Sequence, residues 1–366
     1  YPSGKVRFQS FFKLFSKEYY HNENLTVYRS WIFGVGRTRS IHHYLLYFSF
    51  TISSILSSLF IRKRFDQIYT SSPPLFIGIS GFIISKIKKS DFILEVRDLW
   101  PESVRATDSM DEKSFLYKLA VKLEKFLYKK ANKIIVLTKG FAEHILKITQ
   151  KKEIYFAPNG VSFTEGIHEL PLSRKLFGIE ENDFVVGYFG NIGKVQNLQF
   201  IIDAAKKLTH TNYKFFIVGQ GNDLENLKKR AIEQSLENIV FYPSVEKKQI
   251  SKYINVCDAF LVSLKNDPLF KITIPSKIFE GMAHKKPLLI GIDGEAKEIV
   301  EKARSGIYFA PEESGDFIAK LEELGNDPNL CKIMGNNGHN FVIKNYNREL
   351  IAKNLLKNLT TNFDDN

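Results

Sequence analysis

Cysteine is scarce in this sequence of 366 residues, which contains only Cys257 and Cys331. Two cysteines cannot form a disulfide framework, and no group of cysteine and histidine residues has the spacing of zinc ligands. Hydrophobic residues make up 44% of the chain and charged residues 25%, which excludes a disordered or collagen-like protein. The length allows two domains, and we expect a folded protein of the cytoplasm.

Acidic side chains are in the minority, with 40 Asp and Glu against 52 Lys and Arg and a net charge of +12. Such an excess suits an anionic partner. The candidates are nucleic acid, a phosphorylated small molecule and an acidic membrane surface. The sequence has no nucleic-acid-binding motif, and its basic residues are spread rather than clustered. We therefore do not expect a nucleic-acid partner.

Long hydrophobic runs are also rare, and the uncharged run at residues 44–61 just reaches the length of a membrane span. Ser49, Ser53 and Ser57 recur at helical spacing opposite its large apolar residues. This spacing predicts an amphipathic helix with a hydroxyl face rather than a span.

Short apolar runs alternate with amphipathic helical segments along nearly the whole chain, which is typical of parallel sheets with right-handed crossovers. The predicted strands cover residues 65–72, 92–96, 133–138, 184–189, 213–218, 239–242, 259–264 and 287–292. Helices are predicted between them, including 75–88 and 114–130. Two such series predict two doubly wound α/β domains, at residues 1–165 and 166–345. Residues 1–20 are predicted to contain no strand, so the first domain lacks an opening β-α-β unit or is unusual.

Ligands of open parallel sheets bind beyond the carboxyl ends of the strands. Two glycine-containing loops, at residues 190–193 and 218–222, follow predicted strands, and their backbones can approach a ligand closely. The helix after the first loop offers free N–H groups to an anion. Neither loop has the G-x-G-x-x-G or P-loop pattern, so the signature of a nicotinamide or ATP site is missing.

A third candidate segment begins a helix with Pro275, Ser276 and Lys277, and Glu280 lies one turn further on. Such a helix start could hold a diphosphate, while the carboxylate could accept hydrogen bonds from sugar or ribose hydroxyls. An ordinary helix start with a surface lysine and a glutamate favourable to the helix dipole explains the same residues. Both interpretations stay open on the sequence.

Arg97, Asp98 and Trp100 come directly after the predicted strand at residues 92–96, and Ser72 is at the end of the preceding strand. Asp98 could orient a hydroxyl group or act as a base at this edge. The alternative is a structural ion pair of Arg97 with Asp98 or Glu95.

Taken together, these segments resemble glycosyltransferase family 4, in which two Rossmann-like domains face across a cleft (the GT-B fold). The resemblance is to the branch that builds bacterial O-antigen, capsule and colanic-acid units and includes N-acetylfucosamine transferases. The segments that carry it occur in the family's order and spacing, at residues 70–74, 95–103, 158–161, 190–193 with Gln196, 275–283 and 291–295. By this resemblance residues 1–5 correspond to the loop after the family's second strand, the opening β-α-β is absent, and residues 346–366 form a helix that returns to the first domain.

The resemblance implies a retaining transferase without metal or cofactor that moves a sugar from a nucleotide sugar, a UDP-linked N-acetylated hexosamine or deoxyhexosamine. The acceptor would be a saccharide on a polyprenyl diphosphate. Implied catalytic residues are Asp98 and Lys277. Implied donor-binding residues are Gly190, Asn191, Gly193, Gln196, Gly219, Val245, Ser276, Lys277 and Glu280. Implied acceptor or cleft residues are Ser72, Arg97, Trp100, Glu102 and Asn159.

The first domain would dock on the anionic inner face of the cell membrane through the helix at residues 44–61. The basic residues that flank this helix are Arg37, Arg39, Arg62, Lys63 and Arg64.

Two alternatives share the architecture. A UDP-sugar 2-epimerase would need acidic residues and histidines in the cleft, and the motif loops offer Asp98 and Glu102 but no histidine. A catalytically retired, membrane-associated scaffold is the other alternative, because Ile272 occupies the position of the first glutamate in the family's Glu-x7-Glu motif.

Overall fold

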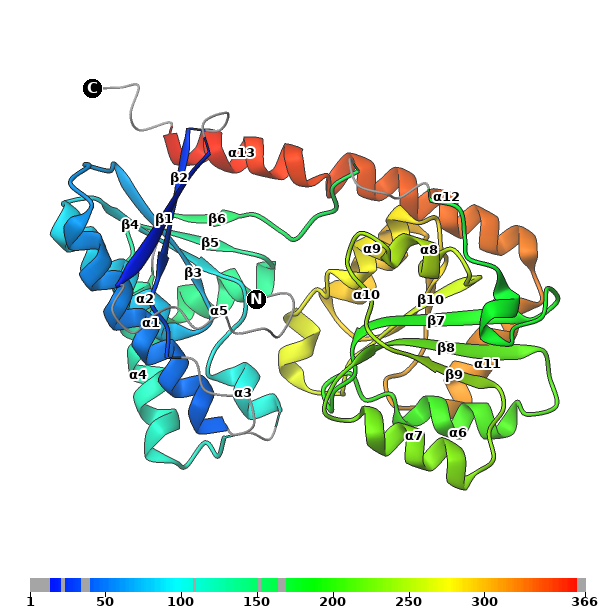
Figure 1. Ribbon diagram of the computed structural model, residues 1–366. Coiled ribbons are helices and arrows are strands. Elements are labelled where there is room, and N and C mark those ends of the chain that lie inside the picture. Colours follow the sequence, from blue (N-terminus) through cyan, green and yellow to red (C-terminus); the bar gives the residue numbers. More distant parts are fainter. Residues whose placement is uncertain are drawn as a thin grey trace. The chain divides into compact units, whose positions relative to one another are not determined.

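The computed structural model describes residues 14–20, 24–33, 40–107, 110–150, 153–163 and 169–360. The chain divides into two compact units, Tyr1–Phe156 and Ala157–Asn366 (Figure 1). The sequence placed this boundary after residue 165. The division comes earlier because the connecting segment already packs on the second unit, where Val161 forms a parallel bridge with Asn347.

The first unit is built on a parallel sheet whose strands follow chain order: β3 (Gln67–Ser72), β4 (Asp91–Val96), β5 (Lys133–Val136) and β6 (Ile154–Phe156). Residues 92–94 and 134–136 are fully buried, which explains why these strands are continuous apolar runs in the sequence. The connecting helices are α2 (Leu75–Lys88), α3 (Glu102–Ala106), α4 (Phe115–Lys130) and α5 (Lys139–Thr149).

An antiparallel hairpin precedes this sheet, formed by β1 (Phe15–Tyr20) and β2 (Leu25–Ser30). The prediction that residues 1–20 contain no strand is therefore wrong for Phe15–Tyr20. This strand has no buried face, so it has no alternating apolar pattern, and it is held by pairing with β2. An exposed ion pair joins Glu18 and Arg29 across the hairpin at 2.9 Å.

The predicted amphipathic helix is α1 (Ser40–Phe60), and Ser53 and Ser57 of its hydroxyl face are buried. Ser53 donates a hydrogen bond to the carbonyl of Trp31, and Ser49 accepts one from the backbone N–H of Phe33. These hydroxyls thus satisfy backbone groups of the segment that follows β2. None of the helices in the described part of the chain is long and apolar enough to cross a membrane.

The second unit contains a six-stranded parallel sheet in the order β12-β11-β10-β7-β8-β9. Its strands are β7 (Phe184–Asn191), β8 (Tyr213–Gln220), β9 (Ile239–Tyr242), β10 (Ala259–Ser263), β11 (Leu288–Gly291) and β12 (Gly306–Tyr308). The order reverses between β7 and β10, so the sheet is doubly wound.

Helices cover this sheet, and one hydrophobic cluster lies between its strands and α6 and α11, with Phe200, Phe215, Phe309 and Phe317 near its centre. The helices are α6 (Gln199–Lys207), α7 (Leu224–Glu233), α8 (Ile250–Ile254), α9 (Lys277–Ala283), α10 (Glu295–Ala303), α11 (Ser314–Gly325), α12 (Pro328–Asn345) and α13 (Arg348–Thr360), with short 3-10 turns η2 (Arg174–Phe177) and η3 (Pro268–Ile272). The return of α13 to the first unit stays a prediction.

Candidate functional site

The carboxyl ends of β7 and β8 form the floor of the candidate site in the second unit. A Cβ atom on Gly219 would lie 1.9 Å from the carbonyl oxygen of Gly190, and one on Gly221 would lie 2.0 Å from that of Ile192. The two loops therefore pack backbone against backbone. Glycine is required at both positions, because any side chain would push the loops apart.

The loop after β7 is braced by Gln196. Its side-chain oxygen accepts hydrogen bonds from the amide of Asn191 at 3.0 Å and from the backbone N–H of Gly193 at 3.1 Å. The hydroxyl of Ser263, at the end of β10, donates to the carbonyl of Gln196. The structure thus brings the predicted donor residues Asn191, Gly193 and Gln196 together.

A pocket of about 260 Å³ opens beside this loop. Three predicted residues, Gly190, Asn191 and Gly219, lie on its β7–β8 side, and Val245 lies on the loop after β9. Ser244 also lines the pocket, and its hydroxyl donates to the side chain of Gln220 at 3.1 Å. The pocket lies at the carboxyl edge of the sheet, where the sequence placed the donor.

Lys277 begins α9 and extends over the backbone of Gly190, where a Cβ atom would lie 3.1 Å from the lysine Nζ. Gly190 has a φ of +120°, which only glycine adopts readily. The Nζ donates a hydrogen bond to the hydroxyl of Tyr188 and lies 3.9 Å from the centre of its ring. Burial lowers the pKa of Lys277 to about 7, although the nearby Glu280 acts to raise it. Near neutral pH the charged and neutral forms of this lysine therefore have similar free energies.

A larger pocket of about 600 Å³ adjoins the first, and the two share Ile250. Glu280 of α9 lines this larger pocket, and so does Ser276, the residue before α9. Burial raises the pKa of Glu280, while Lys277 and Lys247 act to lower it. The remaining lining residues include Gly160, Ser162, Glu169, Lys248, Ser251, His284 and Arg348.

His284 and Tyr188 were not predicted as site residues. The ring of His284 is held at both nitrogens, with Nδ1 2.8 Å from the carbonyl of Glu280 and Nε2 2.9 Å from the hydroxyl of Ser251. Its spacing of four residues from Glu280 on the same helix was the signal available in the sequence. Tyr188 lies inside a strand, where an aromatic residue resembles ordinary core, so nothing in the sequence distinguished it.

Ile272 is the last residue of η3 (Pro268–Ile272). Its neighbour Lys271 lies 3.6 Å from a carboxylate oxygen of Asp293, and Tyr308 donates a hydrogen bond to the same carboxylate at 2.6 Å. Lys271, next to the position of the missing glutamate, is therefore paired with a carboxylate that Tyr308 also holds.

In the first unit, Asp98 and Trp100 line a pocket of about 350 Å³ together with Pro73, Pro74 and Ser103. Burial raises the pKa of Asp98 to about 6, and hydrogen bonds from the Ser103 side chain and the Leu99 backbone act to lower it. A carboxyl group with this pKa gains or loses a proton near neutral pH, as general acid–base chemistry requires.

The other predicted acceptor or cleft residues do not line this pocket. Arg97 lies 3.7 Å from Glu95, which is the structural ion pair that the sequence left open. Glu102 accepts hydrogen bonds from Arg105 and Tyr117 at the start of α3. Ser72 is buried. Asn159 belongs to the second unit, next to Gly160 of the larger pocket.

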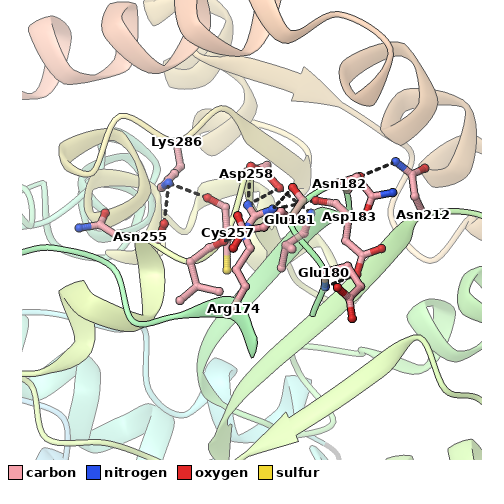
Figure 2. A network of polar contacts seen from close by, with 12 residues as sticks. Arg174, Glu180, Glu181, Asn182, Asp183, Asn212, Asn255, Cys257, Asp258 and Lys286 are labelled. Atoms are coloured by element: carbon pink, nitrogen blue, oxygen red, sulfur yellow. Dashed lines mark hydrogen bonds and ion pairs between the residues drawn. The ribbon is translucent and has the colours of Figure 1, made fainter. Parts of the chain in front are cut away.

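A network of polar contacts lies at the opposite, amino edge of the second sheet (Figure 2). Arg174 donates hydrogen bonds to both carboxylate oxygens of Asp258, at 2.8 and 2.9 Å, and to the carbonyls of Val256 and Asp183. Lys286 donates to the carbonyl of Cys257 at 2.6 Å. These contacts tie η2 to the start of β10 and form a structural clamp at the amino edge. A pocket of about 420 Å³, which Arg174, Asp258 and Lys286 help to line, lies beside them.

The described residues contain no group of three or more His, Cys, Asp or Glu side chains that could hold a metal ion. The candidate site of the second unit thus combines one partly buried lysine, one partly buried carboxylate and two glycine-containing loops. Such a set is suited to a ligand that carries phosphate and hydroxyl groups.

Comparisons with known proteins agree with this assignment. The profile of the family described as Glycosyl transferases group 1 matches residues 171–341. The chain is 22% identical over 269 residues to the probable glycosyltransferase WbjE of Pseudomonas aeruginosa, covering 72% of this chain and 66% of that protein. It is 22% identical over 261 residues to the putative colanic acid biosynthesis glycosyl transferase WcaI of Escherichia coli (strain K12), covering 69% of this chain and 64% of that protein. The match thus spans slightly less than two thirds of each relative.

The fold is also that of a solved structure, HepE (Alr3699) of Anabaena in complex with UDP. The TM-score is 0.69 at 16% sequence identity, and the match covers 85% of this chain and 82% of that chain. The two α/β units and their parallel sheets are those of the GT-B fold. The family model thus assigns residues 171–341 of this chain to a glycosyl transferases group 1 domain.

Proposed function

We propose that the protein transfers a sugar from a UDP-sugar to a saccharide carried on a polyprenyl diphosphate, with retention of configuration at the anomeric carbon. The observation that carries the proposal is the joining of two pockets at one sheet edge. The loop after β7 lines the smaller pocket, Lys277 lies against Gly190 of that loop, and Glu280 lines the larger pocket. A nucleoside diphosphate has matching parts, an anionic diphosphate and a ribose with two hydroxyl groups.

Each part of the donor has a place in this arrangement. The diphosphate lies against the backbone at Gly190 and Gly219, with the Lys277 ammonium and the Ser276 hydroxyl beside it. The ribose hydroxyls donate hydrogen bonds to the Glu280 carboxylate. The base lies along the backbone of Val245. The lining residues of the two adjoining pockets, and the position of Lys277 against Gly190, support this proposed placement.

The chemistry needs stabilisation of the negative charge that develops on the departing UDP. A buried ammonium group at the diphosphate supplies this more strongly than it would in water. The acceptor hydroxyl attacks the anomeric carbon on the face from which UDP leaves, and its proton passes to a departing phosphate oxygen. Asp98 orients the acceptor hydroxyl from the first unit, and the sequence of steps needs no protein nucleophile.

The biological context of the proposal is bacterial surface polysaccharide synthesis, with an N-acetylated hexosamine or deoxyhexosamine as the transferred sugar. The names of the relatives support this context, because WcaI is described as a colanic acid biosynthesis protein. The choice of UDP is supported by the structure of HepE, which contains UDP.

We further infer that the protein lies on the anionic inner face of the cell membrane, where the lipid-linked acceptor is found. An exposed apolar stripe runs along α1, and the exposed residues Arg62, Lys63 and Arg64 follow its end. The stripe consists of Leu45, Phe48, Ile52, Leu56 and Leu59. An apolar face followed by basic residues is the pattern of a helix that lies in a membrane interface. Arg37 and Arg39, the other predicted flanking residues, lie outside the described residues.

The epimerase alternative gains little from the structure. His284 supplies a histidine in the larger pocket, but both its ring nitrogens are already held within the protein. Incubation with a UDP-sugar in the absence of acceptor tests it directly, since an epimerase would convert the sugar and a transferase would leave it unchanged.

Thermal unfolding with UDP, GDP, ADP and CMP tests the proposal. At about 100 times its dissociation constant a ligand adds about 2.7 kcal/mol of stability. We expect a selective shift with UDP, lost in Glu280→Gln and retained in Glu225→Gln, a control on the exposed face of α7. A chain that no nucleotide stabilises, or a Glu280→Gln variant that binds UDP like the parent, would contradict the proposed donor site.

A further inference from the structure

Tyr188 lies two residues before Gly190, which lines the smaller pocket. It lies on β7 with 1% of its surface exposed. Its hydroxyl makes two hydrogen bonds, donating to the carbonyl of Asn191 at 2.5 Å and accepting from the Nζ of Lys277. One buried oxygen atom thus joins the loop after β7 to the first residue of α9.

We propose that Tyr188 is a positioning residue of the diphosphate site, which fixes the Lys277 ammonium against the glycine loop after β7. This inference rests on the proposed role of Lys277 in binding the donor diphosphate. Tyr188 does not contact the donor in this proposal. It acts by holding the groups that do.

The first argument concerns the freedom of the lysine side chain. Lysine has four rotatable bonds, and fixing them on ligand binding costs conformational entropy. Here the Nζ is held twice by the same residue, through the hydroxyl and through the ring face, 3.9 Å from the ring centre. The ammonium is therefore in place before the donor arrives, and most of this cost is met on folding.

The second argument concerns the buried charge. A buried ammonium without a hydrogen-bond acceptor is strongly destabilised. The Tyr188 hydroxyl is such an acceptor, and it can accept because its own proton is committed to the Asn191 carbonyl. The orientation of the hydroxyl is thus set by the loop, which couples the loop conformation to the position of the lysine.

The third argument concerns space. The lysine chain passes over Gly190, where a Cβ atom would lie 2.9 Å from its Cε. Gly190, Lys277 and Tyr188 therefore form one packed unit. The contacts of Lys277 with Gly190 and Tyr188 fix the path of its side chain.

A merely structural tyrosine would stabilise the fold without affecting the diphosphate in particular. The two roles are separated by comparing UDP with uridine, which lacks the phosphates. They are also separated by the dependence on Lys277, because a positioning residue acts only through the group that it positions.

The experiment measures the affinity of the full chain for UDP and for uridine by titration calorimetry, with Tyr188→Phe as the variant. Phenylalanine keeps the ring and the volume and removes only the hydroxyl. We expect UDP to bind about tenfold to a hundredfold more weakly, the usual effect of losing a hydrogen bond to a charged group, and uridine to bind as before. Tyr213→Phe, at the opposite end of the neighbouring strand, is the matched control and should leave both affinities unchanged.

The same titrations in a Lys277→Met background complete a double-mutant cycle. We expect Tyr188→Phe to have little further effect there. An equal loss of UDP affinity in both backgrounds, or an equal loss for uridine, would overturn the positioning role of Tyr188. A parent chain that binds neither UDP nor another nucleotide would overturn the proposed function itself, and that result appears before any variant is made.

Discussion

Lys277 shows how function can oppose stability at a single residue. Its ammonium is buried beside Tyr188 and Gly190, and this burial lowers its pKa from 10.5 to about 7. Between these two values the unfolded chain binds a proton that the folded chain does not. Linkage then requires the free energy of unfolding to rise with pH across this range, by at most about 1.4 kcal/mol per pH unit.

Replacing Lys277 by Met should remove this dependence. We expect the variant to be more stable than the parent near pH 7, with a difference that shrinks as the pH approaches 10, because methionine fills the space without a charge. Urea unfolding at pH 7, 8 and 9 measures the effect, and Lys229→Met, on the exposed face of α7, is the control. Equal slopes in parent and variant would show that Lys277 keeps its ordinary pKa.

The pKa shift of Asp98 changes the pH dependence of stability in the opposite direction to that of Lys277. Burial raises its pKa from 3.8 to about 6, so the folded chain binds more protons than the unfolded chain between these values. The free energy of unfolding should therefore fall as the pH rises from 4 to 6, and Asp98→Asn should abolish that part of the fall.

At pH 7 we expect Asp98→Asn to be more stable than the parent and to bind UDP normally, yet to transfer sugar slowly. Chemical unfolding, UDP titration and transfer to a lipid-linked acceptor report these three properties separately. Unchanged turnover would remove Asp98 from the mechanism.

At the level of elements, the sequence predicted the parallel sheets well, because their strands are buried on both faces and appear as short apolar runs. The helix at α2 begins and ends where it was predicted, and α4 begins one residue after its predicted start because Ser114 is its N-cap. The sequence missed β6 and β12, which have three residues each, too few for any periodicity to appear. It also missed β1, whose pairing with β2 is not a local property.

The candidate site was predicted where glycine, proline and charge mark a turn at the end of a strand. The residues found there were Gly190, Gln196, Gly219 and Glu280. Tyr188 and His284 were missed because their roles depend on which strand and helix meet in space. Arg97 was offered as a cleft residue, and the structure instead pairs it with Glu95.

The clamp that Arg174 forms at the amino edge of the second sheet predicts how much these contacts stabilise the second unit. Arg174→Met leaves Asp258 and several backbone carbonyls without their partner, so we expect a loss of about 2–4 kcal/mol in the stability of the second unit. Arg230→Met breaks a more exposed ion pair with Asp203 and should cost less than about 1 kcal/mol. Urea unfolding distinguishes the two, and a similar small loss in both would show that the clamp contributes little.

For the whole molecule, the net charge of +12 and the apolar stripe on α1 bear on membrane binding. Sedimentation with vesicles of anionic and of neutral lipid should show binding to the anionic vesicles, weakened by salt. Phe48→Ser with Leu56→Ser should abolish it, because both side chains would enter the lipid interface.

Ile232→Ser, which replaces an exposed apolar residue of the second unit, should leave vesicle binding intact. Binding that survives the double substitution on α1 would show that another surface meets the membrane.

The bridge between Val161 and Asn347 closes the second unit on itself. The backbone N–H of Arg348 donates to the carbonyl of Val161, and that of Val161 donates to the carbonyl of Tyr346, so Val161 and the residue before α13 lie side by side. A chain whose ends meet tolerates circular permutation. Residues 161–347 could therefore be re-opened at an exposed turn, such as the one before α11, and their old ends joined by a short linker. Such a permutant would keep the two pockets at the carboxyl edge on a chain that begins and ends at the turn before α11.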